Sequence, residues 1–270
     1  MIVFPNAKIN IGLNIVAKRD DGYHDIETIF FPIGFRDILE INTSDRDFSF
    51  VNSGIIIEQG NAANNICYKA YNIVKEEHLI IPVNIHLHKI IPSGAGLGGG
   101  SSDGSFTLKV INSLQHLHID DFTLINYAGK LGSDCPFFML NKPVFATGTG
   151  NIFESISINL NNYYLVIINP GIHINTAKAY SQTKPVKPKH SLKELIENPI
   201  EKWRGLIYND FEPVIFKDYP QIENVKHQLY NEGAVYASMS GSGSSVFGLF
   251  KEKPYLQKIF EKQLIWEELL

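Results

Sequence analysis

Residues 92–103 read Pro92-Ser93-Gly94-Ala95-Gly96-Leu97-Gly98-Gly99-Gly100-Ser101-Ser102-Asp103, with five glycines in twelve positions. Glycine adopts positive φ angles without strain, and it has no Cβ to keep a ligand away from the backbone. A helix that begins beside such a loop offers unpaired N–H groups and a partial positive charge. The natural ligand of this stretch is therefore an anion such as phosphate.

The segments on both sides of the stretch have regular patterns. Over residues 83–91, apolar side chains alternate with polar ones, which predicts a strand with one buried face. From Ser101 to about His118, apolar residues recur at helical spacing, with Ser101 or Ser102 as the expected N-cap. Gly104 costs that helix up to ~1 kcal/mol relative to alanine, so its presence predicts a close backbone approach. A flexible linker would not have such periodic neighbours.

Two common phosphate-binding patterns fit this stretch poorly. A P-loop requires Gly-x-x-x-x-Gly-Lys-Ser/Thr, and no lysine follows these glycines. The dinucleotide fingerprint Gly-x-Gly-x-x-Gly is present, with acidic residues downstream, at Gly94, Gly96, Gly99, Asp120 and Asp121. The residues before Asp120 are a helix tail, however, and not the second strand that a dinucleotide fold needs. A nucleotide-binding oxidoreductase is therefore the weaker alternative.

A third pattern, Pro-x-x-x-Gly-Leu-Gly-x-x-Ser-Ser before a long helix, fits at every fixed position: Pro92, Gly96, Leu97, Gly98, Ser101 and Ser102. On this motif the chain resembles the GHMP kinases, the superfamily of galactose, homoserine, mevalonate and phosphomevalonate kinases. The resemblance implies an ATP-dependent small-molecule kinase that uses ATP and Mg²⁺, with residues 92–103 around the phosphates and Asn65 and Lys89 near the adenine. No residue is assigned as a metal ligand.

The resemblance also implies the fold. We expect an α+β protein of two domains, a ribosomal protein S5 domain 2-like ATP-binding domain over residues 1–159 and a ferredoxin-like domain over residues 160–270. The active site is expected in the cleft between them. The pattern of the remaining chain predicts strands over residues 8–16, 28–32, 37–41, 55–58, 163–169, 234–239 and 246–250, and helices over residues 64–77, 191–197, 200–208 and 221–232.

Two polar residues of the N-terminal strand are candidates for chemistry. If Ala7 and Ile9 face the core, the period of two turns Lys8 and Asn10 to the opposite face. A solvated strand face would explain such a pair in an unrelated protein. The first GHMP motif has a lysine and an asparagine here, so the resemblance makes Lys8 catalytic and Asn10 substrate-binding.

Asp134 precedes Cys135-Pro136-Phe137-Phe138 and has two interpretations. It can cap a helix that begins at Cys135. It can also be the general base, since phosphoryl transfer needs an oriented hydroxyl and a group that takes its proton. The resemblance favours the base, with Lys8 orienting the hydroxyl and stabilising the developing negative charge.

The segment Arg19-Asp20-Asp21-Gly22-Tyr23-His24-Asp25-Ile26-Glu27-Thr28 resembles one branch of the family. That branch phosphorylates the 2-hydroxyl of cytidine diphosphate methylerythritol in the methylerythritol phosphate route to isoprenoids. By its pattern His24 reads the cytosine, Tyr23 and Tyr180 flank the base, and Thr176 belongs to the same substrate wall. An aromatic ring offers a stacking face, and histidine a directional donor and acceptor. A homoserine- or mevalonate-type kinase is the alternative within the family.

A second cluster of small residues, Ser240-Gly241-Ser242-Gly243-Ser244-Ser245, lies between two predicted strands. In isolation it would be a hairpin turn. Six small residues exceed what a two-residue turn needs, so we expect a roomy concavity lined by amides. The family has a C-terminal glycine-rich loop of this kind over substrate and phosphates, which makes Gly241, Ser242 and Gly243 candidate substrate-binding residues.

Composition limits the possible partners. The chain has 270 residues, a net charge of −4 and no basic run with interleaved aromatic residues, which argues against nucleic acid. Cys67 and Cys135 form no Cys-x-x-Cys pair, and no stretch resembles a signal peptide or a membrane span. We expect a cytoplasmic enzyme with a small-molecule substrate, present as a monomer or weak homodimer, without nucleic-acid or membrane partners.

Overall fold

The computed structural model describes residues 1–55 and 64–270. The chain forms two compact units, each assembled from separate segments. The first unit contains residues 1–8, 32–93 and 98–142, and the second contains residues 9–31, 94–97 and 143–270. The glycine-rich stretch therefore contributes to both units. The predicted domain boundary near Leu160 stays a prediction.

A four-stranded sheet forms one layer of the first unit. Its order is β1 (Ile2–Val3), β4 (Ile38–Thr43), β6 (Val83–Lys89) and β5 (Ser49–Gly54), with β5 parallel to β6 and the other pairs antiparallel. The predicted alternation in β6 is confirmed, because Val83, Ile85 and Leu87 are buried. Lys89 occupies the next position of the same parity and is buried as well.

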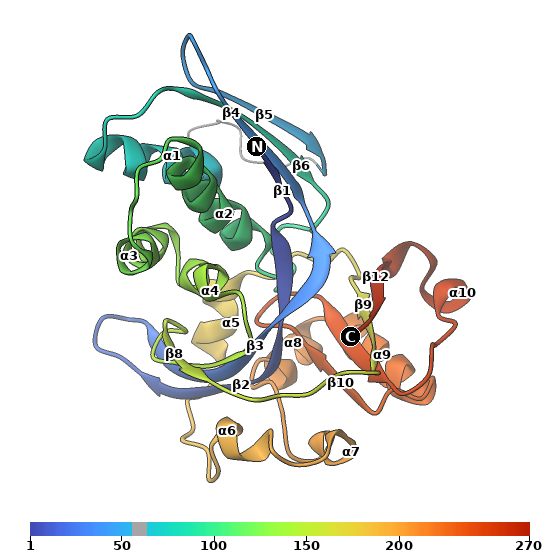
Figure 1. Cartoon of the computed structure of the whole chain (residues 1–270). Coiled ribbons are helices and arrows are strands. Elements are labelled where there is room, and N and C mark those ends of the chain that lie inside the picture. Colours follow the sequence, from blue (N-terminus) through green and yellow to red (C-terminus); the bar gives the residue numbers. More distant parts are fainter. Residues whose placement is uncertain (56–63) are drawn as a thin grey trace. The chain divides into compact units, whose positions relative to one another are not determined.

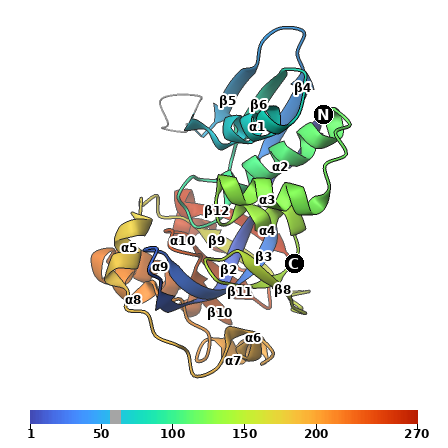
Figure 2. The same cartoon turned by 90° about the vertical axis from the view of Figure 1, so that its left-hand side faces the viewer.

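Helices cover one face of this sheet (Figures 1 and 2). They are α1 (Ile66–Glu77), α2 (Gly99–Leu114), α3 (Asp121–Leu131) and α4 (Cys135–Leu140). Asn65 and Asp120 cap α1 and α3 through side-chain oxygens that accept backbone N–H groups. The close approach expected at Gly104 is confirmed, since a Cβ there would lie 2.8 Å from the Ile66 side chain of α1.

Helix α2 differs from its predicted bounds at both ends. It begins at Gly99, so Ser101 and Ser102 lie inside the helix, and neither caps it. The N-cap is Gly98 in the left-handed conformation, which only glycine adopts without strain. The helix ends at Leu114 because positive φ angles at His116 and His118 break it. Strand β5 ends at Gly54, before the strand expected over residues 55–58, of which residues 56–58 lie outside the described residues.

Two long strands, β2 (Asn6–Lys18) and β3 (His24–Arg36), run through both units. They form a sheet of order β2-β3-β7-β8 with β7 (Val144–Thr147) and β8 (Ile152–Ser155). A third sheet belongs to the second unit and has the order β10 (Tyr236–Met239), β11 (Val246–Phe250), β9 (Tyr164–Ile168) and β12 (Leu264–Leu269). All its pairs are antiparallel.

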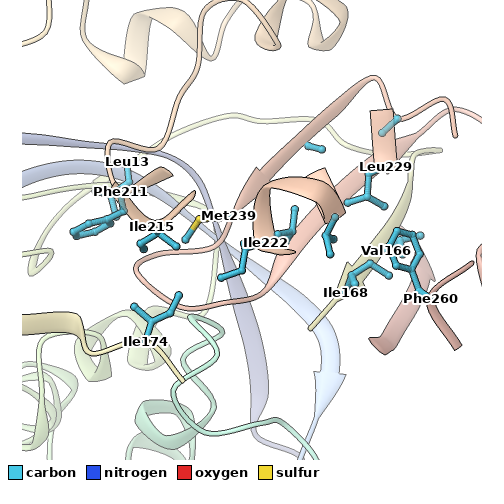
Figure 3. Packing of buried hydrophobic residues seen from close by; sticks show 14 of the residues in the cluster. Leu13, Val166, Ile168, Ile174, Phe211, Ile215, Ile222, Leu229, Met239 and Phe260 are labelled. Atoms are coloured by element: carbon cyan, nitrogen blue, oxygen red, sulfur yellow. The ribbon is translucent and has the colours of Figure 1, made fainter. Parts of the chain in front are cut away.

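The helices of the second unit are α5 (Thr176–Gln182), α6 (Leu192–Leu195), α7 (Ile200–Trp203), α8 (Glu212–Asp218), α9 (Pro220–Asn231) and α10 (Gln257–Phe260). Its core joins α8 and α9 to the third sheet, as Figure 3 shows for Ile215, Ile222 and Val166. The sequence pattern missed α5, α8 and β12, which are short and have few turns over which a period can repeat. Within the described residues, no helix has the length and apolar character that a membrane crossing requires.

Candidate active site

The start of α2 is the centre of the candidate site in the first unit. The first bond of the helix runs from the Ser102 N–H to the Gly98 carbonyl, at 2.9 Å. The N–H groups of the preceding residues have no intrahelical acceptor, as at every helix N-terminus. A Cβ built on Gly100 would meet no atom within 4 Å, so space is open beside these amides. The arrangement suits an anion such as a phosphate.

Lys8 lies against this helix start. A Cβ on Gly98 would lie 3.1 Å from Lys8 Cε and 2.9 Å from the Phe138 ring. Gly98 is therefore required twice, for its φ of 71° and for the space that the lysine stem occupies. The buried stem leads the Lys8 ammonium toward Asp134, whose Oδ2 lies 3.4 Å from Nζ.

The Lys8–Asp134 pair is asymmetric in its exposure. The Lys8 side chain is 4% exposed, whereas that of Asp134 is 33% exposed. Burial lowers the pKa of Lys8, and the Asp134 carboxylate opposes that effect only in part. Asp134 is the N-cap residue of α4, but its side chain makes no capping hydrogen bond. The Asp134 carboxylate pairs with Lys8 and makes no capping hydrogen bond, and its role as the general base stays a prediction.

Side chains that the sequence analysis missed hold β2, α2 and α4 together. Asn141 directly follows α4, and its Nδ2 donates to Asn6 Oδ1 at 2.8 Å. From α2, Ser105 Oγ donates to the Cys135 carbonyl and Lys109 Nζ to the Phe138 carbonyl, each at 2.8 Å. These bonds fix the elements that carry Lys8 and Asp134. No motif marks them, because isolated polar residues in a sequence give no sign of their partners.

Asn65 and Lys89, expected near the adenine, both have partners within the first unit. The Asn65 side-chain oxygen accepts the Cys67 N–H at 2.8 Å. Lys89 Nζ donates to Asp37 Oδ2 at 2.5 Å and to Asp103 Oδ2 at 2.7 Å. The adenine roles stay predictions, and Asp37 is a further charged residue that the sequence analysis took for the start of a strand. The buried role of Asp37 could have been inferred from Lys89. In the alternating pattern of its strand Lys89 falls on the buried face, and a buried ammonium needs a buried carboxylate as its partner.

In the second unit, the two glycine-rich segments are packed against each other. Ser240 Oγ donates to the Gly96 carbonyl at 2.8 Å, and the Ser245 N–H donates to the Ala95 carbonyl at 3.2 Å. A Cβ on Gly96 would overlap the Ser240 carbonyl, and one on Gly243 would overlap the peptide between Ala95 and Gly96. The expected roomy concavity at residues 240–245 is therefore wrong: small residues are needed here for close packing.

The hairpin between β2 and β3 carries the predicted base-recognition residues. The His24 ring stacks on Tyr180 of α5, with centroids 4.9 Å apart and an interplanar angle of 24°. One turn earlier in α5, Thr176 Oγ1 lies 3.1 Å from Ser242 Oγ. Tyr23 is 67% exposed beside this group. Burial, together with the charge of Lys18, lowers the pKa of His24 and favours the neutral ring, which can both donate and accept.

Asn10 lies on a buried face of β2. Its Nδ2 donates to Thr28 Oγ1 at 2.9 Å, and its backbone N–H donates to Ser240 Oγ at 3.2 Å. The strand face that carries Asn10 is thus covered by protein and is not a solvated face. Asn10 connects β3 with the second glycine-rich segment, and its contact with a substrate stays a prediction.

Metal-binding groups were sought throughout residues 1–55 and 64–270. No cluster of three or more histidine, cysteine, aspartate or glutamate side chains there could hold an ion. His86 and His88 both contact Ser53 Oγ, at 2.8 and 2.9 Å, and no third ligand accompanies them.

Comparison with protein families gives two matches along the chain. Residues 65–142 match the family described as GHMP kinases N terminal domain. Residues 191–262 match the family described as GHMP kinases C terminal. The first match contains the start of α2 together with Asp134.

Individual relatives cover almost the whole chain. Proteins called 4-diphosphocytidyl-2-C-methyl-D-erythritol kinase from Bacteroides fragilis and Parabacteroides distasonis are each 50% identical to it. The alignments cover 96% and 99% of this chain, and 95% and 98% of the relatives. A crystal structure of 4-(cytidine 5'-diphospho)-2C-methyl-D-erythritol kinase superposes with a TM-score of 0.78 at 29% identity, covering 92% of this chain and 90% of that one.

Proposed function

The chain belongs to the GHMP kinase family, and from that premise we propose that it transfers the γ-phosphoryl group of ATP to the 2-hydroxyl of 4-(cytidine 5'-diphospho)-2-C-methyl-D-erythritol. The fold is the two-domain GHMP kinase fold of mixed helices and sheets, and the activity class is ATP-dependent phosphorylation of a small molecule. The substrate is suggested by the names of relatives at 50% identity.

One observation carries the proposal: Lys8, Asp134 and the start of α2 converge within the first unit. Phosphoryl transfer requires positioned phosphates, an oriented hydroxyl, a proton acceptor and charge compensation. The N-terminal amides of α2 supply donors for phosphate oxygens. Asp134 accepts the proton of the attacking hydroxyl, and the Lys8 ammonium stabilises the negative charge that develops.

Magnesium enters this reaction with its substrate. ATP is used as its Mg²⁺ complex, and Mg²⁺ needs few protein ligands because phosphates and waters fill most of its coordination sphere. The lack of a three-ligand metal cluster among the described residues is compatible with this role. The ion neutralises phosphate charge during the transfer.

The second unit supports recognition of a cytidine base. His24 and Tyr180 provide an aromatic stack, and the neutral His24 ring can pair with a hydrogen-bonding base edge. Thr176 and Ser242 add hydroxyls next to that stack. We assign the base to this group, and we assign the reaction to the cytoplasm, where ATP is made.

The test is a phosphate-transfer assay with purified protein and Mg·ATP. Three acceptors are offered side by side: the cytidine diphosphate methylerythritol, homoserine and mevalonate. We expect kcat/KM for the cytidine substrate to exceed that for either competitor by at least about 10³-fold, because only this substrate engages the His24 stack. Preferential phosphorylation of homoserine or mevalonate would refute the proposed substrate.

A further inference from the structure

A buried ion triad lies directly behind the start of α2. Its members are Asp37, Lys89 and Asp103, with exposures of 0%, 2% and 1%. They come from three elements: Asp37 joins β3 to β4, Lys89 ends β6, and Asp103 lies in the second turn of α2. The triad is separate from the Lys8–Asp134 pair, and the proposed mechanism does not use it.

The triad fixes the chain on both sides of the glycine-rich stretch. On the entry side, Asp37 Oδ1 accepts the N–H groups of Ile90 at 2.5 Å and Ile91 at 2.8 Å. On the exit side, Lys89 holds Asp103 in α2 at 2.7 Å. Because Asp37 Oδ2 also binds Lys89, one aspartate connects the two sides. The residues before Pro92 and the first turns of α2 therefore share one anchor.

The first residue of α2 rests on the same anchor. A Cβ built on Gly99 would lie 2.9 Å from Lys89 Nζ and 2.7 Å from the Ile91 side chain. The Lys89 ammonium and the Ile91 side chain therefore both leave no room for a side chain at Gly99. Lys89 and the first residue of α2 are therefore in close contact.

The charges of the triad balance when one carboxyl carries a proton. Burial and the neighbouring Asp37 raise the pKa of Asp103 to about 8, although Lys89 opposes this shift. Burial opposes the charge of Lys89, but the two carboxyl groups outweigh it and raise the pKa of the ammonium. Cys67 of α1 is the other titratable group beside Asp103, and burial raises the pKa of its thiol, so it is neutral.

Stability alone is a poor explanation for such a group. Replacing buried ion pairs with packed apolar side chains is often neutral or stabilising, because desolvation offsets the Coulombic attraction. Directional hydrogen bonds, in contrast, fix geometry. Four of them meet in this triad, and two end on the backbone next to Pro92.

We propose that Asp37, Lys89 and Asp103 form a positioning clamp that sets the conformation of the phosphate-binding amides and thereby the affinity for ATP. Asp37 is a positioning residue that acts through Ile90, Ile91 and Lys89. The identity of the ligand as ATP rests on the proposed function, whereas the clamp itself rests on the bonds described above.

Two isosteric variants of the same triad test the clamp. Asp37→Asn removes the charge that binds Lys89 and weakens the bonds to two amides, so we expect KM for ATP to rise about 10–100-fold. KM for the acceptor should stay within about twofold. Asp103→Asn weakens the contact between Lys89 and α2, so its KM for ATP should also rise, by more than about threefold.

A cavity variant separates positioning from stability. Val74→Ala, in α1 of the same core, destabilises the first unit without touching the triad. Amide hydrogen exchange at residues 90–91 and 99–103 should accelerate in Asp37→Asn and stay unchanged in Val74→Ala below its melting temperature. Should Asp37→Asn fail to fold, Asp103→Asn still decides. An unchanged KM for ATP in Asp103→Asn would overturn the clamp.

Binding of a nonhydrolysable ATP analogue, measured by calorimetry, makes the test independent of the acceptor. If the wild type binds the analogue but phosphorylates none of the acceptors, the proposed function is wrong. The clamp is still supported in that case if Asp37→Asn binds the analogue more weakly than the wild type does. Equal affinity in Asp37→Asn and the wild type overturns the clamp, whatever the reaction. The clamp is also overturned if Val74→Ala weakens binding of the analogue as much as Asp37→Asn does.

Discussion

Two buried lysines of the first unit face carboxylates in different ways. Lys89 lies 2.5 and 2.7 Å from two fully buried aspartates, and together they raise its pKa. Lys8 lies 3.4 Å from Asp134, which is one-third exposed, and burial lowers its pKa. The charge of the Lys89 ammonium is compensated by two aspartate side chains of the fold. The charged form of Lys8 is destabilised by burial, so further negative charge nearby would stabilise it.

This difference separates a charge with a structural role from the charge that we propose for catalysis. A lysine enclosed by two aspartate side chains is held in a single arrangement and has little to offer an incoming phosphate. A lysine whose charged form burial disfavours, beside a solvent-accessible carboxylate, is arranged to act on a ligand. The distinction depends on the surroundings of each ammonium, since the residue type is the same.

The largest expected effect follows from removing the proposed base. Asp134→Asn keeps the shape of the side chain but cannot accept the hydroxyl proton, so turnover should fall by about 10²–10⁴-fold with an unchanged melting temperature. Asp120→Asn is the matched control, because Asp120 is also an N-cap aspartate and its side chain does form capping bonds. Steady-state kinetics measure both. Near-normal turnover in Asp134→Asn would remove Asp134 from the mechanism.

A crossed pair of lysine variants sharpens the comparison. Lys8→Met should lower turnover by about 10²–10³-fold through lost charge stabilisation, with a small change in unfolding free energy. Lys89→Met leaves two carboxyl groups buried without their cation and should cost about 3–5 kcal/mol of stability. Activity assays and urea unfolding applied to both variants give the test. If Lys8→Met were the more destabilised protein, the two assignments would have to be exchanged.

The last prediction concerns the dependence of stability on pH. Folding raises the pKa of Asp103 to about 8 from about 3.9 in an unfolded chain. The native state therefore binds a proton that the unfolded state releases, and this contribution is lost as the pH rises from about 4 to about 8. The melting temperature of the wild type should fall relative to that of Asp103→Asn as the pH rises across this range. Scanning calorimetry at several pH values measures it, and parallel profiles would contradict it.

Much of the local structure could be predicted from the sequence. The alternation over residues 83–91, the helix after the glycine-rich stretch and the caps at Asn65 and Asp120 depend on neighbours within a few residues. The sequence analysis was wrong at positions whose conformation depends on tertiary packing. Gly98, rather than Ser101 or Ser102, is the N-cap of α2, because the Lys8 stem and the Phe138 ring require a residue without a side chain.

The identity of the family and the residue types at the candidate site were determined by the sequence alone, because motifs are patterns of neighbouring residues. The pairing of Lys8 with Asp134, the enclosure of Lys89 by Asp37 and Asp103, and the packing of Gly96 against residues 240–243 were decided only by the tertiary structure. Periodicity tells which side of a strand is buried. It cannot tell which distant segment supplies the partner, since that depends on how the layers meet.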